Sequence, residues 1–385
     1  MNSQQKKINA VNITFFASVL ISTAFSIVPI IVFIINLTKG TSYTLPFYTY
    51  IAEHPVVNIL TGQGIIAVPL LIFIIATKQN YPKLVRLKKM KISNLLLSIL
   101  LGLLIQPLLR FLNALSLVYT ENAISDTVLG ISNQVPFLVA VLLMCVLPGI
   151  FEESMFRGAL FESYREANPW KAVILSGFLF GIMHGNLNQF TYAFILGVIF
   201  ALIVEATDSI LSTMIIHFFT NLTSVFTMYL LPKLYTIIKE LITYLETNGD
   251  AASATQLQNI IGDTTLSAEE WMEANISAAS SLTMSLSQVL LTYLPSAVIF
   301  SVLAFLVLKL IAKRTGTWNN FRVMYLGADE VVVEAEAKGP YDKEVELNVL
   351  PGNPTLRIMT VPLIAAIALS ALSMFFVESL NYLPK

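Results

Sequence analysis

The feature that most constrains this sequence is a series of apolar blocks, each about 20 residues long, separated by shorter polar stretches. A helix of about 20 residues rises about 30 Å, which is the thickness of the hydrocarbon core of a bilayer. Only 12% of the 385 residues are charged, about half of the share of about 25% that is typical of globular proteins. So few charges cannot coat a soluble domain of this size, and the chain is predicted to be a polytopic membrane protein.

The apolar blocks predict an all-α fold of eight to nine transmembrane helices. Each span must be a helix, because lipid offers no hydrogen-bond partner to an exposed backbone polar group. Nine spans would place the two termini on opposite sides of the membrane. The candidate spans are 11–37, 56–77, 92–118, 135–151, 170–187, 190–204, 209–231, 285–312 and 359–379.

Basic residues predict the orientation of the chain. The segment 78–91 is rich in Lys and Arg and contains no acidic residue. Cytoplasmic loops carry an excess of such residues, so we expect this segment and the N-terminus in the cytoplasm. The Lys-rich and Asn-rich composition, with Cys145 as the single cysteine, is compatible with a bacterial plasma membrane. The formal net charge of −1 gives no global field to attract nucleic acid.

Two stretches are long enough to form structure outside the bilayer. Residues 232–284 are predicted to be extracytoplasmic, with Ala-rich and Ser-rich runs suited to amphipathic helices. Residues 313–358 are predicted to be cytoplasmic. Within them, polar and apolar residues alternate over 330–337 and 343–350, on either side of the sequence KGPYD. Alternation around a short turn predicts a β-hairpin.

Polar residues in the central apolar blocks are the candidate functional residues, because ionisable groups are costly in a membrane and by default indicate function. Glu152 and Glu153 lie at the end of one block, and His184 and His217 lie in two others. Asn221 follows His217 by four residues and therefore shares its helical face. The alternative interpretation is that each of these groups only binds helices together.

The spacing of these residues suggests that they meet. Residues 135–166 and 170–187 read as two helices joined by a turn at Asn168-Pro169, since proline suits a first helical position. Glu152 and His184 are equally far from Asn168 along the sequence. In an antiparallel pair of helices they should lie at the same level, although the rotation of each helix about its axis is left open.

The two adjacent glutamates are expected to differ in role. Glu153 and Arg157 have the i,i+4 spacing of a helical ion pair. Glu152 points about 100° away from Glu153 on a helix, so it cannot make the same contact. We expect Glu153 to bind Arg157 while Glu152 faces a polar cavity, and the reverse assignment stays open.

These residue types suit hydrolysis by water. A carboxylate beside an imidazole can orient and deprotonate a water molecule. Donors on one helix face, here His217 and Asn221, suit a developing oxyanion. The sequence has no evident Ser or Cys nucleophile motif, which favours direct attack by water.

Three motifs carry a family resemblance: Glu152-Glu153-x-x-x-Arg157, Phe180-x-x-x-His184 and His217-x-x-x-Asn221. In this order, within apolar helices, they resemble the signature of the CAAX prenyl endopeptidase and bacteriocin-processing (CPBP, or Abi) family. These intramembrane glutamate proteases are related to the Ras-converting CAAX endopeptidase. The resemblance covers residues 135–225 approximately and leaves the long 232–284 and 313–358 segments unmatched.

The resemblance implies a role for each motif residue. Glu152 would be the catalytic glutamate and His184 would help it to activate water, while His217 and Asn221 would form the oxyanion site. The supporting residues would be Glu153 and Arg157. It also implies an all-helical core whose polar cavity opens toward the cytosol.

On this basis the chain divides into six parts, with the catalytic helices second. The parts are 1–134 (N-terminal helices), 135–231 (catalytic helices), 232–284 (extracytoplasmic loop), 285–312 (a transmembrane helix), 313–358 (cytoplasmic segment) and 359–385 (C-terminal helix). The expected substrate is a membrane-associated peptide or lipidated protein, in contact with membrane lipid. No metal or other cofactor is expected.

Three other hypotheses remain open. Glu152, His184 and His217 could together hold a catalytic zinc ion, although the chain has no His-Glu-x-x-His motif. A non-catalytic scaffold or immunity protein would bind partners through 313–358. A transporter would use the same buried polar groups, but the paired broken helices typical of transporters are missing.

Two further sets of residues have open interpretations. Gln106, Arg110 and Asn113 share one face of the third span. Arg110 could neutralise a substrate carboxylate or hold an acid in the cavity. Alternatively, it could pair with an acidic residue such as Glu205 or extend to the membrane interface. The basic segment 78–91 could attract anionic lipid, or it could act only as a determinant of topology.

Overall fold

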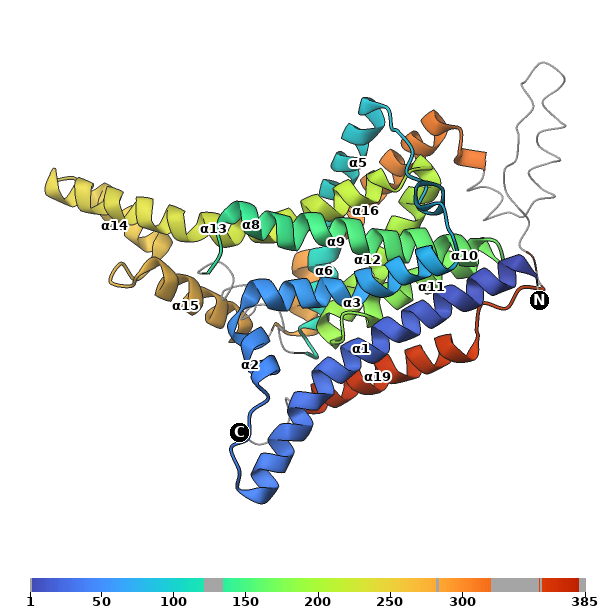
Figure 1. Ribbon diagram of the computed structural model, residues 1–385. Coiled ribbons are helices and arrows are strands. Elements are labelled where there is room, and N and C mark those ends of the chain that lie inside the picture. The colour runs from blue at the N-terminus through green and yellow to red at the C-terminus, as the bar shows by residue number, and fades with distance from the viewer. Residues whose placement is uncertain (1, 121–133, 282–283, 320–352, 354, 381–385) are drawn as a thin grey trace, which may run out of the picture.

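The chain is an integral membrane protein whose regular elements are all helices in the part that the structure describes (Figure 1). The computed structural model describes residues 2–120, 134–281, 284–319, 353 and 355–380. Eight helices are long and apolar enough to cross a membrane, which confirms the predicted fold class. The predicted β-hairpin at 330–350 lies outside the described residues.

Eight helices of the described residues are candidates to span the membrane. They are α1 (Ser3–Lys39), α3 (Pro55–Ala76), α5 and α6 (Ile92–Leu104 and Gln106–Ser116), the composite helix Phe137–Arg165, α12 (Leu187–Thr207), α13 (Leu211–Thr247), α16 (Leu286–Thr315) and α19 (Val361–Leu380). Short helices α2 (Pro46–Glu53) and α4 (Tyr81–Leu84) lie in connections.

The composite helix is not uniformly α-helical. It consists of α8 (Phe137–Val141), the π-helix η1 (Leu142–Val146), α9 (Leu147–Glu153), the π-helix η2 (Ser154–Leu160) and α10 (Phe161–Arg165). π-helical turns inside α-helices occur frequently at functional sites. Here they flank α9 on both sides.

The fifth of the nine predicted spans, 170–187, is shorter than expected. Its helix, α11, runs from Pro169 to Ile182, and its 14 residues fall short of the roughly 20 that cross a bilayer. Gly185 ends this segment with a φ of 72°, a backbone conformation that glycine adopts without strain. The side chain of Asn186 then caps the first turn of α12 by accepting a hydrogen bond from the Gln189 amide at 2.8 Å.

The long loop predicted at 232–284 is largely helical. α13 continues to Thr247 without a break, and α14 (Ala251–Ile261) and α15 (Ala268–Ser281) pack against this extension. A small apolar core holds the three helices together, and the rings of Tyr235 and Trp271 stack within it at 4.8 Å. The extension therefore forms a helical arm beyond the bundle (Figure 1).

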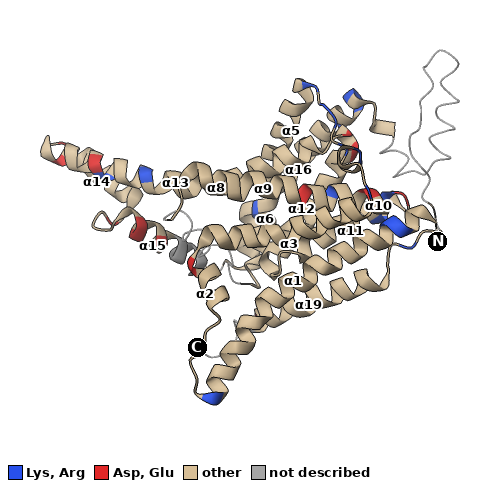
Figure 2. Cartoon of the chain, in the orientation of Figure 1, with Lys and Arg blue, Asp and Glu red and all other residues tan. Residues whose placement is uncertain are grey.

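Positive charges gather at one end of the bundle, where α1 begins, α10 ends and the segment 78–91 lies (Figure 2). We call this end the basic end. It is the end that the positive-inside rule assigns to the cytoplasm, and this orientation stays a prediction.

Helices α11 and α12 pack so closely that only glycine fits between them. A Cβ atom on Gly177 would lie 2.7 Å from the backbone nitrogen of Val198, and one on Gly197 would lie 2.6 Å from the Cα atom of Gly177. Small residues at such crossings let two backbones approach each other in membrane proteins. This contact fixes the position of α11 and therefore of the turn that follows it.

Gly177→Ala is expected to destabilise the protein by about 2 kcal/mol, because overpacking a filled contact typically costs about 1–3 kcal/mol. Thermal unfolding in detergent measures the effect. The matched control is Gly64→Ala in α3, where an added Cβ would meet no atom within 4 Å. An equal loss of stability in both variants would contradict the close contact.

Candidate functional site

The candidate site lies near the middle of the composite helix, where four segments meet. Glu152 and Glu153 end α9, and His217 comes from α13. His184 follows the last residue of α11, and Gln63 comes from α3. The helices thus bring together polar side chains that lie far apart in the sequence.

Glu153 is fully buried and forms the predicted ion pair with Arg157. Arg157 Nη1 lies 3.2 Å from Glu153 Oε1, and both side chains have no exposed surface. The Arg157 guanidinium also lies over the rings of Phe180, at 4.3 Å, and Phe200, at 5.0 Å. Such cation–π contacts add to the stabilisation of the desolvated charge. A buried charge is tolerated only with partners of this kind.

His217 connects the two glutamates. Its Nδ1 atom lies 2.9 Å from Glu153 Oε1, and its Nε2 atom lies 3.9 Å from Glu152 Oε2. A carboxylate accepts hydrogen bonds, so Nδ1 carries the proton in the first contact. The second separation is too long for a hydrogen bond and suits a bridging water molecule.

Glu152 is the accessible member of the pair, with 14% of its side chain exposed. Gln63 Nε2 donates a hydrogen bond to Glu152 Oε1 at 3.3 Å. Sequence reasoning missed Gln63, which lies in the apolar helix α3 far from the three motifs. A polar amide within a membrane span was the signal that could have found it.

His184 lies beside the same group. Its Nδ1 atom is 2.8 Å from the Phe180 carbonyl oxygen, to which it donates, so that Nε2 is left for other partners. The imidazole interacts electrostatically with both Glu152 and His217. This agrees with the prediction that spacing places Glu152 and His184 at one level. No hydrogen bond joins these two residues among those that the structure describes.

Asn221 has a backbone partner about two turns before the glutamates in the composite helix. Its Nδ2 atom donates to the carbonyl oxygen of Met144 at 2.8 Å. Pro148 is four residues after Met144 and has no N–H, so it cannot make the usual helical hydrogen bond to this carbonyl. Asn221 replaces that hydrogen bond and ties α13 to η1.

The described residues contain no group of three or more His, Cys, Asp or Glu side chains arranged to hold a metal ion. Three side chains were considered as zinc ligands: Glu152, His184 and His217. They lie near one another but do not form a metal-binding group in the described residues. One nitrogen of each imidazole has a protein acceptor, the Phe180 carbonyl for His184 and Glu153 for His217.

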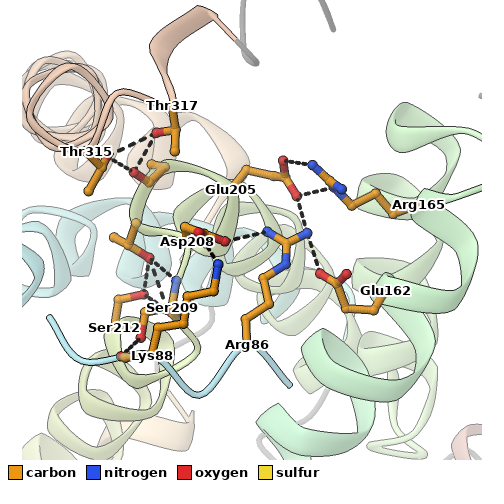
Figure 3. A network of polar contacts seen from close by, with 12 residues as sticks. Arg86, Lys88, Glu162, Arg165, Glu205, Asp208, Ser209, Ser212, Thr315 and Thr317 are labelled. Carbon is orange, nitrogen blue, oxygen red and sulfur yellow. Dashed lines mark hydrogen bonds and ion pairs between the residues drawn. The ribbon is translucent and has the colours of Figure 1, made fainter. Parts of the chain in front are cut away.

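A second polar cluster lies at the basic end (Figure 3). Glu205 Oε1 is 2.9 Å from Arg86 Nη2 and 2.6 Å from Arg165 Nε, and Arg86 also pairs with Glu162 and Asp208. Burial opposes the charged form of Arg86, but Glu205 and Glu162 outweigh it and raise its pKa above the usual value. The cluster ties the segment 78–91 to α10 and α12.

The considered pairing of Arg110 with Glu205 is wrong. Arg110 is exposed on α6, whereas Glu205 is buried against Arg86 and Arg165. The neighbours of Arg110 on the same face do make contacts: Gln106 Nε2 donates to Thr220 Oγ1 at 3.4 Å, and Asn113 Oδ1 accepts from Asn188 at 3.1 Å.

Glu153→Gln is expected to destabilise the protein by about 3–5 kcal/mol, because it leaves the buried charge of Arg157 without its counter-ion. Thermal unfolding in detergent measures the loss. The double variant Glu153→Gln/Arg157→Met should lose less than the sum of the two single variants, since it removes both charges. Additive losses would show that the two charges do not interact. Glu152→Gln, at the partly exposed neighbour, should change stability by less than about 1 kcal/mol.

The central helices match a known family. Residues 134–223 match the family model described as type II CAAX prenyl endopeptidase Rce1-like. No match to the chain was found among curated proteins or among solved structures. The matched segment contains every motif residue of the candidate site, from Glu152 to Asn221. Residues 134–223 are thus similar to the Rce1-like domain of type II CAAX prenyl endopeptidases, a family of membrane proteases.

Proposed function

We propose that the protein is an intramembrane endopeptidase that hydrolyses a peptide bond by direct attack of water, without a covalent intermediate. The substrate is a membrane-associated peptide or a lipidated protein. The single observation that carries the proposal is the placement of His217, which is held by buried Glu153 on one side and faces accessible Glu152 on the other. A carboxylate and an imidazole on either side of one water site are the elements of general base catalysis.

Glu152 is the general base in this proposal. It accepts a proton from a water molecule placed between its Oε2 atom and His217 Nε2, which are 3.9 Å apart. The water oxygen forms a bond to the carbonyl carbon of the substrate, and the bond from that carbon to the amide nitrogen then breaks. The proton held by Glu152 passes to the leaving nitrogen, which departs as an amine. Gln63 fixes the other oxygen of the carboxylate.

The remaining motif residues position groups or stabilise charge. The Nδ1 atom of His184 is bound to the Phe180 carbonyl, which leaves Nε2 available, and His184 uses it to help Glu152 to orient the water. His217 Nε2 and the second amide hydrogen of Asn221 serve as the hydrogen-bond donors to the oxyanion that forms on the carbonyl oxygen. Glu153 and Arg157 are positioning residues, because they hold the ring of His217 without touching substrate.

We further propose that the basic end faces the cytoplasm of a bacterial cell, with the N-terminus on that side of the plasma membrane. The support is the gathering of Lys and Arg at this end of the bundle (Figure 2). No metal or other cofactor takes part in the proposed reaction.

Glu152→Gln is expected to lower cleavage by roughly 10²–10⁴-fold, the contribution typical of a positioned general base. The measurement compares membrane and secreted peptides of cells that make the native protein or the variant at matched levels. Products should vanish and their precursors accumulate in the variant. The matched control is Glu246→Gln, an exposed carboxylate on the α13 arm. Unchanged cleavage in Glu152→Gln would remove Glu152 from the mechanism and favour a non-catalytic role.

Removal of metal is expected to leave cleavage unchanged, because the proposed base and oxyanion donors are all protein side chains. Purified protein is treated with a chelator, assayed, and analysed for bound elements before and after treatment. Stoichiometric zinc whose removal abolishes cleavage, and whose return restores it, would overturn the metal-free mechanism in favour of a zinc-bound water.

A further inference from the structure

Two cavities adjoin each other on the outer face of α11, away from the candidate site. One is polar, has a volume of about 400 Å³ and includes Asn168 and Arg357 in its lining. The other is apolar, has a volume of about 580 Å³ and includes Trp170 and Phe178 in its lining. Both are also lined by Lys171, Ile358 and Met359. The shared walls make them a single amphipathic site, and both volumes fall in the usual range of ligand pockets, about 300–1,000 Å³.

The apolar half follows one face of α11 into the bilayer. Trp170, Ile174 and Phe178 are spaced four residues apart and therefore stack along the helix. Ile174 is 46% exposed on this face. From Lys171 to Phe178 the helix rises about 10 Å, which is enough to hold several methylene groups of a hydrocarbon chain. Trp170 lies where the groove begins, and tryptophan favours the membrane–water interface.

The polar half carries two cations that lack acidic partners. Lys171 and Arg357 are exposed, and neither forms an ion pair within the described residues. The acid at this end of α10, Glu166, binds Lys7 instead, with 3.6 Å between Lys7 Nζ and Glu166 Oε1. An ammonium and a guanidinium beside one cavity suit a phosphate group, which accepts charge-assisted hydrogen bonds from both.

We propose that this composite site binds an anionic glycerophospholipid of the surrounding membrane. The phosphate contacts Lys171 and Arg357, and one acyl chain lies in the groove along Trp170, Ile174 and Phe178. Basic pockets between transmembrane helices bind anionic head groups in this way. The amphipathic lining matches the two halves of such a lipid, and the site lies at the basic end of the bundle, where a head group is found.

The lipid site is separate from the proposed catalytic groups but shares a helix with them. Phe180 lies two residues beyond Phe178 on α11, and His184 follows the end of the same helix. The segment that precedes α19 supplies Ile358 and Met359, so bound lipid fills the space between this segment and α11. The inference does not depend on the peptidase proposal, because lipid binding is measured without any substrate.

The test measures lipid affinity of the purified full-length protein by native mass spectrometry. The probes are dioleoylphosphatidylglycerol, the zwitterionic dioleoylphosphatidylcholine, and sodium phosphate as a free anion. The native protein is expected to bind phosphatidylglycerol at least tenfold more tightly than phosphatidylcholine, and free phosphate should not compete at millimolar concentration. Binding of the two lipids with equal affinity, or displacement of lipid by free phosphate, would overturn the proposal.

Variants then locate the site. The double variant Lys171→Gln/Arg357→Gln should abolish the preference for phosphatidylglycerol. Ile174→Asn should weaken the binding of both lipids, because it places an amide in the apolar groove. The matched control, Lys89→Gln/Lys91→Gln, removes two exposed cations of the segment 78–91 that line neither cavity, and it should bind like the native protein. An equal loss of the preference for phosphatidylglycerol in this control would show that the lipid is attracted to the basic surface in general, and it would overturn the proposed site. Tighter binding of a farnesylated peptide than of phosphatidylglycerol would show that this site binds substrate, and it would also overturn the proposal.

Discussion

The buried carboxylate of Glu153 is the contact on which the site depends. It neutralises Arg157 within its own helix and accepts a hydrogen bond from His217 of α13. Without it a guanidinium and an imidazole would be left in a low-dielectric interior, at a cost that packing alone would not offset. The same contact sets which nitrogen of His217 faces Glu152. The side chain of Glu153 therefore determines both the charge balance of the site and the orientation of the His217 ring.

Spacing within single helices predicted part of this arrangement. The i,i+4 pair of Glu153 and Arg157 follows from helix geometry alone, and the equal distance of Glu152 and His184 from Asn168 brings them to one level. The contact of His217 with Glu153 was not predictable in this way, because it depends on the rotation of two separate helices. The sequence pattern predicted that His217 acts together with Asn221 instead, because the two residues share a helical face.

Contacts between segments far apart in the sequence account for the other differences between the sequence-based predictions and the structure. Glu205 was considered as a partner for Arg110, but the segment 78–91 folds back across the bundle end and supplies Arg86. Gln63 reaches Glu152 from α3, outside the segment 134–223 that matches the family model. The site in the matched segment is thus completed by a helix that lies outside this segment. The open carbonyl of Met144, by contrast, was deducible, because Pro148 has no N–H to donate to it, although its partner Asn221 comes from a separate helix.

The shortness of α11 has a consequence for the bilayer around it. A helix of 14 residues rises about 21 Å, roughly 9 Å less than the hydrocarbon core. Lipid beside a short hydrophobic segment compresses to match it, which is the thinning described as hydrophobic mismatch. The turn that holds His184 lies where α11 ends, short of the full width of the hydrocarbon core. Thinning of the bilayer beside this helix would bring bulk water closer to the site than it comes beside the longer helices.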